Sequence, residues 1–367
     1  MPAAARANAY QDAVTTPQTF QYDKVWLTIE TFLGDALTLE MHKDGQGVFR
    51  DLDDRIIIAD GAVELFGVTP YSQFTAWCEL NGLDWFIFGW DWRRRLEETV
   101  SFFLTRFLPR FQSTVQNACN ADPLRDFILV GHSFGGMIVN LILRQYSSLL
   151  ANMTRAVTVA APFYGYDGQI HRWFEGDQYF NQLGKMSVIR VISSMPACYT
   201  LPYLDPGTYS ANQPALAQDP QYPLADYPSH DAANPAQIAD PFNPVGQRYP
   251  GNTGFDLTEL SHGGQIFQQL TAPLTQYADI FFNIRGVQST PDTVVGGIDW
   301  KLLAGPANPP TSPITNQPPQ LPGDGVQPAW STRLVSLPAA QWRTVVGVDH
   351  MFMMEYPATQ QVIGQVL

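Results

Sequence analysis

The sequence has few cysteines, no long apolar run and no targeting segment. Its three cysteines, Cys78, Cys119 and Cys198, are far apart and odd in number, so neither a disulfide framework nor a cysteine-based metal motif is predicted. No stretch reaches the length of about 18 apolar residues that a membrane-spanning helix needs. Residues 1–21 lack the apolar core of a signal peptide. We therefore expect no transmembrane segment and, by default, a cytoplasmic protein.

Basic residues are also scarce. The chain has 21 Lys and Arg against 34 Asp and Glu, a formal net charge of −13, and no basic run longer than Arg93-Arg94-Arg95. Nucleic-acid binding and adsorption to an anionic membrane by charge alone both need clustered cations, so neither is expected. The 367 residues are 45% hydrophobic, which suits one large α/β domain with a cap, or two domains.

Apolar segments with strand and helix periodicity alternate along most of the chain. This alternation predicts the α/β class, with a mostly parallel sheet flanked by helices on both faces. The predicted strands are 55–60, 84–89, 127–130, 156–160, 279–286 and 342–348. The predicted helices are one or two short ones in 23–39, then 71–81, a long one from 96 that Pro109 bends or splits, one from the serine turn to about 150, and 358–367. Residues 41–55 are predicted to be a loop.

The composition changes after Pro162, where the strand–helix rhythm fades and aromatic residues, Pro and Asn dominate. We expect residues 22–162 and 278–367 to form the core, with a first strand and a loop missing from its start. Residues 163–277 are expected to form an inserted helical or irregular cap, and residues 1–21 to be disordered. The aromatic residues between Phe163 and Phe180 are expected to be cap core, with an acyl pocket as the alternative.

One short stretch combines a strand pattern, a tight turn and a helix pattern. Residues 127–130 lead directly into Gly131-His132-Ser133-Phe134-Gly135-Gly136, and a helix-periodic apolar run follows. Gly131 and Gly135 are expected to let the strand and helix approach closely, so that Ser133 projects its hydroxyl beyond the sheet. The helix N-terminus behind the serine favours developing negative charge. The pattern is typical of the nucleophile elbow of an α/β-hydrolase. A glycine-rich turn in another parallel α/β protein is the alternative.

A serine becomes nucleophilic when a histidine takes its proton and a carboxylate orients that histidine. His350 is the candidate base, because it closely follows the last predicted strand. His132 lies within the serine turn and is not expected to reach Ser133 as a base. The other four histidines precede the expected cap or lie in it: His42, His171, His230 and His262.

The orienting acid is expected between the last two strands. Asp324 lies between Gly323 and Gly325, which suits a tight loop that presents a carboxylate. Asp292 and Asp299 are alternatives in the same interval. A simple Asp-Gly turn, with no catalytic role for Asp324, is the other interpretation.

Several further segments resemble one family and occur in its order. They are Val25-Trp26-Leu27, Trp90-Asp91-Trp92-Arg93, residues 131–136, residues 196–206, residues 323–331 and Asp349-His350-Met351. Together they resemble the lecithin:cholesterol acyltransferase family, which includes phospholipid:diacylglycerol acyltransferases and lysosomal phospholipase A2. Trp90 stands where that family has Tyr, Phe134 where Met or Leu is usual, and Val326-Gln327 where Thr-Val is usual.

The resemblance implies an α/β-hydrolase with a cap, acting on lipid or ester substrates, including at a membrane or lipoprotein surface. It implies Ser133 as nucleophile, Asp324 as orienting acid, His350 as general base and the backbone N–H of Phe134 as one oxyanion donor. Trp90 and His132 are expected to contact substrate. The family's Pro-Gly loop, which supplies the second oxyanion donor, has no counterpart before Trp26. A chain truncated at its start, a donor from elsewhere in the chain and a weakened enzyme are the three alternatives. Losing such a donor typically costs about 10²–10³ in rate.

Two classes of function follow from these residues. The first is a serine-dependent acyl hydrolase or O-acyltransferase, on lipids or on non-lipid carboxylic esters, with no cofactor and no metal. The second is a catalytically impaired relic that binds lipid or ester but lacks a complete oxyanion hole.

Overall fold

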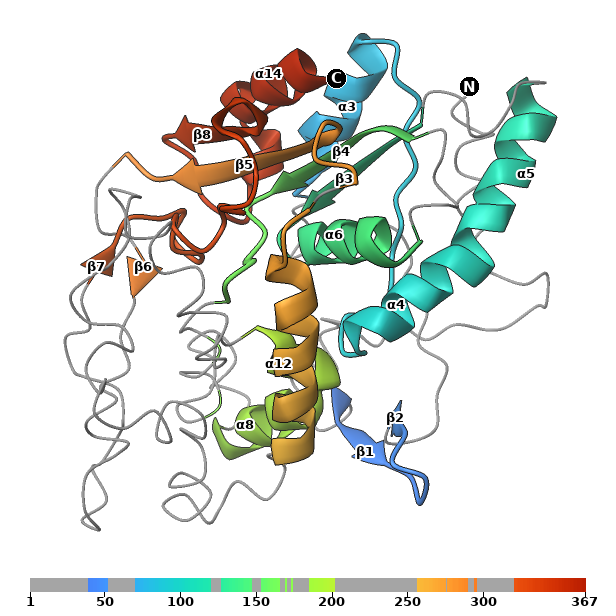
Figure 1. The fold of residues 1–367 in the computed structure, drawn as a ribbon, viewed down its shortest axis with the longest axis vertical. Helices are drawn as coiled ribbons and strands as arrows, with labels where there is room; N and C mark the ends of the chain where they lie inside the picture. The colour runs from blue at the N-terminus through green and yellow to red at the C-terminus, as the bar shows by residue number, and fades with distance from the viewer. Residues whose placement is uncertain are drawn as a thin grey trace.

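The central feature is a four-stranded parallel sheet. The computed structural model describes residues 39–51, 70–119, 127–146, 153–165, 169, 173, 185–201, 256–274, 276–289, 294–295 and 320–367. The sheet has the order β3-β4-β5-β8, and every neighbouring pair is parallel (Figure 1). Its strands are β3 (Phe127–His132), β4 (Met153–Val159), β5 (Phe281–Val287) and β8 (Trp342–Val346). This arrangement confirms the predicted α/β class.

Each face of the sheet carries its own layer of helices. Ala156 and Phe281 contribute to the hydrophobic cluster on one face, and Val157 and Ile284 to the cluster on the other. Because side chains alternate along a strand, β4 and β5 are buried from both sides. Val130 on β3, the terminal strand of the described sheet, is instead 36% exposed.

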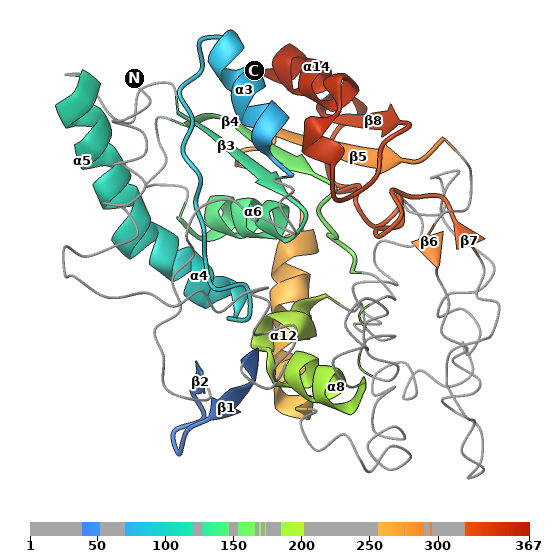
Figure 2. The ribbon, with the colours of Figure 1, turned by 180° about the vertical axis from the view of Figure 1, so that it is seen from behind.

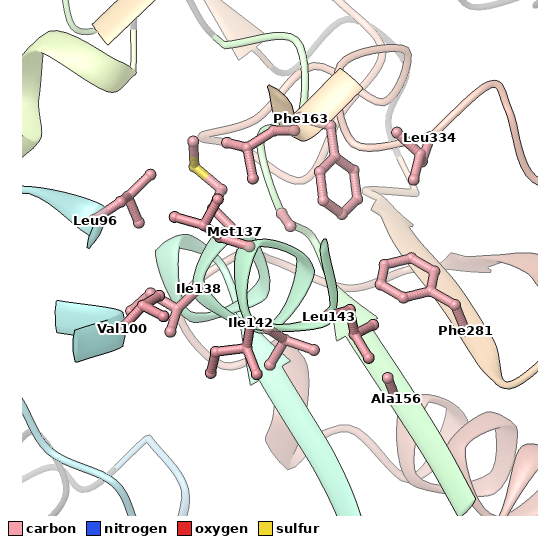
Figure 3. Close-up of a cluster of buried hydrophobic side chains, with 14 of the residues drawn as sticks. Leu96, Val100, Met137, Ile138, Ile142, Leu143, Ala156, Phe163, Phe281 and Leu334 are labelled. Atoms are coloured by element: carbon pink, nitrogen blue, oxygen red, sulfur yellow. The ribbon is translucent and has the colours of Figure 1, made fainter. Parts of the chain in front are cut away.

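The first face is covered by α6 and the helices around it. They are α4 (Leu96–Phe102), the π-helical turn η2 (Phe103–Phe107), α5 (Leu108–Cys119), α6 (Phe134–Tyr146) and α12 (Leu257–Thr271). Figure 3 shows Met137 and Ile138 of α6 beside Leu96 and Val100 of α4, with Phe281 on the sheet side. All five side chains are at most 3% exposed, so α6 is held at its first turns by packing.

The second face is covered by α3 (Ser72–Leu80) and α14 (Pro357–Val366). The two helices lie side by side above the sheet in both ribbon views (Figures 1 and 2). The short 3-10 turn η8 (Met353–Glu355) connects β8 to α14 and packs its buried Met353 and Met354 into the same cluster. The helices predicted at 71–81 and 358–367, and the strands at 127–130, 156–160, 279–286 and 342–348, are confirmed.

Pro109 interrupts the long helix from Leu96, as predicted. The interruption takes the form of a π-helical turn just before the proline, where the N–H of Leu108 donates to the carbonyl of Phe103. Proline has no N–H, and its ring would crowd the carbonyl four residues earlier, that of Thr105. A wider turn ahead of the proline relieves this crowding.

The strand predicted at 84–89 is wrong. In the structure, residues 83–91 are neither strand nor helix. Phe86, Phe88 and Trp90 nevertheless pack against the first hydrophobic cluster. The alternating aromatic residues therefore mark burial, and a strand also needs a neighbouring backbone ladder, which an apolar pattern does not supply.

The loop predicted at 41–55 is also wrong for its described part. Residues 41–51 form an antiparallel hairpin of β1 (Met41–Lys43) and β2 (Phe49–Asp51). The Asp44 carboxylate accepts hydrogen bonds from the backbone N–H groups of Gln46 and Val48, both at 2.9 Å, and Gly47 adopts φ 78°. The polar Asp-Gly-Gln-Gly sequence is thus the turn between two three-residue strands.

The described residues of the expected cap are mainly helical. They include α8 (Lys185–Ser194), the 3-10 turn η5 (Pro196–Thr200) and α12. Phe163, Tyr164 and Trp173 are at most 2% exposed, as expected of core. The remaining short elements are β6 (Val294–Val295), β7 (Gln320–Leu321) and η7 (Ala339–Gln341).

Some predictions lie outside the described residues: those for 1–21, for most of 23–39, for the strand at 55–60, and for most of the expected cap. The domain boundaries and the missing first strand stay predictions. No helix in the described part is long and apolar enough to cross a membrane.

Two adjacent glycines on α12 give a matched test of how closely this helix packs against η5. A Cβ atom on Gly263 would lie within 2.6 Å of the Tyr199 carbonyl carbon, whereas a Cβ atom on Gly264 would meet nothing within 4 Å. We expect Gly263→Ala to lower the free energy of unfolding by about 1–3 kcal/mol. Gly264→Ala should raise it by roughly 0.4–1 kcal/mol, because alanine favours helix. Urea denaturation measures both, and equal effects would contradict the contact between α12 and η5.

Candidate active site

The turn between β3 and α6 holds Ser133 in a strained conformation. Ser133 has φ 54°, in the left-handed region that residues other than glycine rarely adopt. Its N–H donates to the carbonyl of Val159 at 2.8 Å, and its own carbonyl accepts from the N–H of Gly136 at 2.9 Å. Backbone strain of this kind persists only where surrounding contacts impose it, and it concentrates at functional sites.

Close approach at this turn requires glycine at two positions. A Cβ atom on Gly131 would collide with the carbonyl group of Gly135, and one on Gly136 would lie 2.5 Å from the Ala161 Cβ. The prediction for Gly131 is confirmed. The prediction for Gly135 is wrong in its detail, because a Cβ there would meet only the Trp90 ring, at 3.5 Å. The backbone of Gly135 is what Gly131 approaches closely. Gly136 is the second position where a side chain would clash, in this case with Ala161.

His350 bridges the predicted nucleophile and the predicted acid. Its Nε2 lies 2.8 Å from Ser133 Oγ, and its Nδ1 lies 2.8 Å from Asp324 Oδ2. The His350 side chain is 11% exposed and the Asp324 side chain 1%. Three residues from distant parts of the chain thus form one continuous hydrogen-bonded series, with its serine end at the carboxyl end of β3.

The Asp324 carboxylate is held in place by backbone groups of its own loop. Its Oδ1 accepts from the N–H groups of Val326 at 3.1 Å and Gln327 at 2.7 Å, which leaves Oδ2 for His350. The Asp324 carbonyl also accepts from the His350 N–H at 2.8 Å, and Gly325 adopts φ 92°. The loop therefore fixes both the carboxylate and the backbone of the histidine. The alternatives Asp292 and Asp299 lie outside the described residues.

The other described histidines take no part in this series. His42 lies on β1, and His262 lies on α12 with its Nε2 against the Glu97 carboxylate. His171 and His230 fall outside the described residues. Phe134 is the first residue of α6, so its N–H belongs to the helix-terminal groups that lack an intrahelical partner. The part of the chain before residue 39, where the second oxyanion donor is expected to be missing, is not described.

Trp90 lies against the serine turn. Its ring is the nearest neighbour of Gly135 and stacks on Phe88, with centroids 5.6 Å apart. The indole N–H is buried and has no hydrogen-bond partner in the described part of the chain. The residues that follow Trp90 anchor this segment to the hairpin of β1 and β2. Arg93, itself 1% exposed, pairs with Asp91 and Asp51, each at 2.8 Å, and so ties this segment to the hairpin.

The His132 ring is hydrogen-bonded to Tyr71, a residue that no motif in the sequence marks. Its Nδ1 lies 2.9 Å from the Tyr71 hydroxyl, and its ring centroid lies 5.0 Å from that of His350. Burial, reinforced by the neighbouring His350, lowers the pKa of His132 to about 3, so this ring is neutral at physiological pH. Burial raises the pKa of Tyr71 to about 12, so its hydroxyl keeps its proton. Substrate contact by Trp90 or His132 stays a prediction.

Among the described residues, no group of three or more His, Cys, Asp or Glu side chains is arranged to hold a metal ion. Burial raises the pKa of the Cys78 thiol to about 11, which keeps it protonated and poorly nucleophilic.

Comparisons with known proteins add little. No protein-family model and no curated protein matches the chain. One solved structure, described as "The crystal structure of Tle4-Tli4 complex", aligns with a TM-score of 0.49 and 12% identity. The alignment covers 98% of this chain and 78% of that one. A likeness this distant assigns neither an activity nor a family.

His132, whose Nε2 is buried, predicts how stability depends on pH. An unfolded histidine has a pKa near 6.5, so between that pH and about 3 the unfolded state binds the extra proton. The contribution of this group to stability is complete above about pH 6.5 and is lost as the pH falls toward 3, by at most about 1.4 kcal/mol per pH unit. Urea denaturation between these pH values should show a shallower dependence in His132→Asn than in the wild type. Identical slopes would contradict a His132 ring that stays neutral in the folded protein.

Proposed function

We propose that the protein is a serine-dependent acyl hydrolase or O-acyltransferase, acting on lipid or other carboxylic esters through an acyl-enzyme. The observation that supports this most strongly is the series Ser133–His350–Asp324, with both donor–acceptor distances at 2.8 Å. Such a series matches the roles of nucleophile, general base and orienting carboxylate.

In the proposed reaction, Ser133 Oγ attacks the ester carbonyl carbon and its proton passes to His350 Nε2. Asp324 stabilises the imidazolium through Nδ1–H and stays ionised. The negative charge that develops on the carbonyl oxygen faces the Phe134 N–H at the start of α6. The tetrahedral intermediate collapses, the alcohol leaves with the proton from His350, and the acyl group remains on Ser133.

The second half-reaction decides between hydrolysis and transfer. His350 Nε2 takes a proton from water or from an acceptor alcohol, whose oxygen attacks the acyl-enzyme. Collapse of the second intermediate releases the acid or the new ester and returns the proton to Ser133. Both outcomes use the same three residues, so the series by itself favours neither.

We also propose the α/β-hydrolase fold and membership of the lecithin:cholesterol acyltransferase family. The order Ser, Asp, His along a parallel sheet supports the fold. Among the family segments, Trp90-Asp91-Trp92-Arg93 contacts the serine turn at one end and is anchored by a buried ion pair at the other. Residues 163–277 would be the cap, and lipid at a membrane or lipoprotein surface would be the natural substrate class.

The alternative is a relic that binds lipid or ester without turning it over. It would hold if the Phe134 N–H were the single donor to the oxyanion. It is disfavoured by the strain kept at Ser133 and by the intact hydrogen bonds to His350.

Ester hydrolysis separates these two functions. With p-nitrophenyl esters of increasing acyl length, we expect turnover in the wild type and its near-complete loss in Ser133→Ala and His350→Ala. Asp324→Asn should lower kcat by about 10⁴, because the neutral amide supports the wrong imidazole tautomer. Ser101→Ala, a change at an exposed position on α4, is the matched control and should leave turnover unchanged.

Turnover that Ser133→Ala leaves intact would refute the assignment of the nucleophile. Binding of long-chain esters by a folded wild type without any turnover would instead establish the relic. A rate that rises with acyl length would support a lipid substrate over a small ester, and product esters formed on adding an alcohol would show acyl transfer.

A further inference from the structure

The first turn of α3 lies between the serine turn and the His350 loop. Tyr71, the residue directly before α3, contacts the serine turn through the 2.9 Å hydrogen bond between its hydroxyl and His132 Nδ1. The Tyr71 carbonyl accepts from the N–H of Thr75 at 3.0 Å, so the position of the phenol follows the position of the helix.

A carboxylate from the other end of the chain caps the same turn. Glu355 Oε1 accepts from the N–H of Gln73 at 3.0 Å, and Oε2 from the Ser72 hydroxyl at 3.2 Å. Free N–H groups at a helix start favour a negative charge, yet α3 has no acidic residue in its first turn. Glu355 supplies that charge from η8, five residues after His350, and so ties the base loop to α3.

The His132 ring completes the connection. It is centred 5.0 Å from the His350 ring, and its buried Nε2 has no hydrogen-bond partner among the described residues. With Nδ1 engaged by Tyr71 and Nε2 buried, neither ring nitrogen is open to a substrate.

We propose that Tyr71, His132 and Glu355 are positioning residues that hold His350 at hydrogen-bonding distance from Ser133. This inference rests on the proposed function and assigns His132 a positioning role in place of substrate contact. Tyr71 is expected to donate to His132 Nδ1, which places the remaining ring proton on Nε2. Glu355 fixes the other side of the same loop through α3.

The kinetic test removes one hydroxyl at a time. Tyr71→Phe should lower kcat for a short p-nitrophenyl ester by about 10- to 100-fold, because a small displacement of a general base is costly. KM should stay within about twofold, since the Tyr71 hydroxyl is engaged by His132 and the inference gives it no contact with the substrate. Thr75→Val is the matched control, since it also removes a hydroxyl from the start of α3. Among the described residues, that hydroxyl donates to the Ser72 carbonyl at 2.9 Å and not to the serine turn. The control variant should leave both constants unchanged.

Two further variants keep the inference testable if Tyr71→Phe folds poorly. Glu355→Gln should also lower kcat without raising KM. In the double variant Tyr71→Phe/His132→Asn, the loss should be no larger than in the more impaired single variant, because residues that act as one unit are not additive. Independent multiplication of the two losses, or unchanged kcat in Tyr71→Phe and Glu355→Gln, would overturn the positioning role.

NMR of the histidine rings does not depend on turnover, so it tests this inference separately from the proposed function. In protein carrying ¹⁵N-labelled histidine, we expect His132 to give one neutral tautomer protonated at Nε2, and the His350 signals to change in Tyr71→Phe but not in Thr75→Val. His132→Asn and His350→Ala assign the signals. Unchanged His350 signals in Tyr71→Phe would overturn the positioning role even in an inactive protein. Changed signals in a protein without turnover would leave the positioning contacts standing and refute the enzymatic function alone.

Discussion

The contact between Gly131 and the backbone of Gly135 is the constraint on which the site depends. A side chain on Gly131 would collide with the Gly135 carbonyl, so β3 and α6 approach closely only because glycine is there. That closeness forces Ser133 into the left-handed region, where its carbonyl accepts from Gly136 and its N–H bonds the end of β4. The buried first turns of α6 hold the geometry in place from the other side. Strain at one residue is thus stabilised by packing around a whole helix.

The parallel sheet explains how residues 133, 324 and 350 meet. β3, β5 and β8 run in one direction, so the loops that follow them emerge at the same edge. Ser133 directly follows β3, and His350 follows β8 by four residues. Asp324 arrives from the long connection between β5 and β8, and its loop is fastened by hydrogen bonds to its own backbone and to the His350 N–H. The acid therefore positions its histidine through two atoms, a carboxylate oxygen and a carbonyl oxygen.

The residues that meet at the site could be predicted where the signal is local. The glycines around Ser133 and the strand pattern before His350 each identify a turn. The required order Ser, Asp, His placed the acid between the last two strands, where the flanking glycines favoured Asp324 over Asp292 and Asp299. Interactions between distant segments could not be predicted in this way. Nothing near Tyr71 or Glu355 in the sequence marks a contact with the serine turn or with the start of α3, and the buried pair Asp51–Arg93 joins residues 42 positions apart. The two incorrect predictions of secondary structure have the same cause. The aromatic pattern at 84–89 reports burial without a backbone partner, and the Gly-rich run at 44–47 is too short a signal to separate a hairpin turn from a loop.

The most direct measurement is the reaction of the purified protein with a fluorophosphonate, followed by peptide mass mapping of the adduct. Ser133 Oγ would attack phosphorus and displace fluoride, and His350 would accept the serine proton, so the reagent reports an activated serine without requiring the natural substrate. The account predicts a single adduct on Ser133 in the wild type and none in His350→Ala. A folded wild-type protein that stays unlabelled, or one labelled at another serine, would contradict the claim that these three residues form a working nucleophile, base and acid.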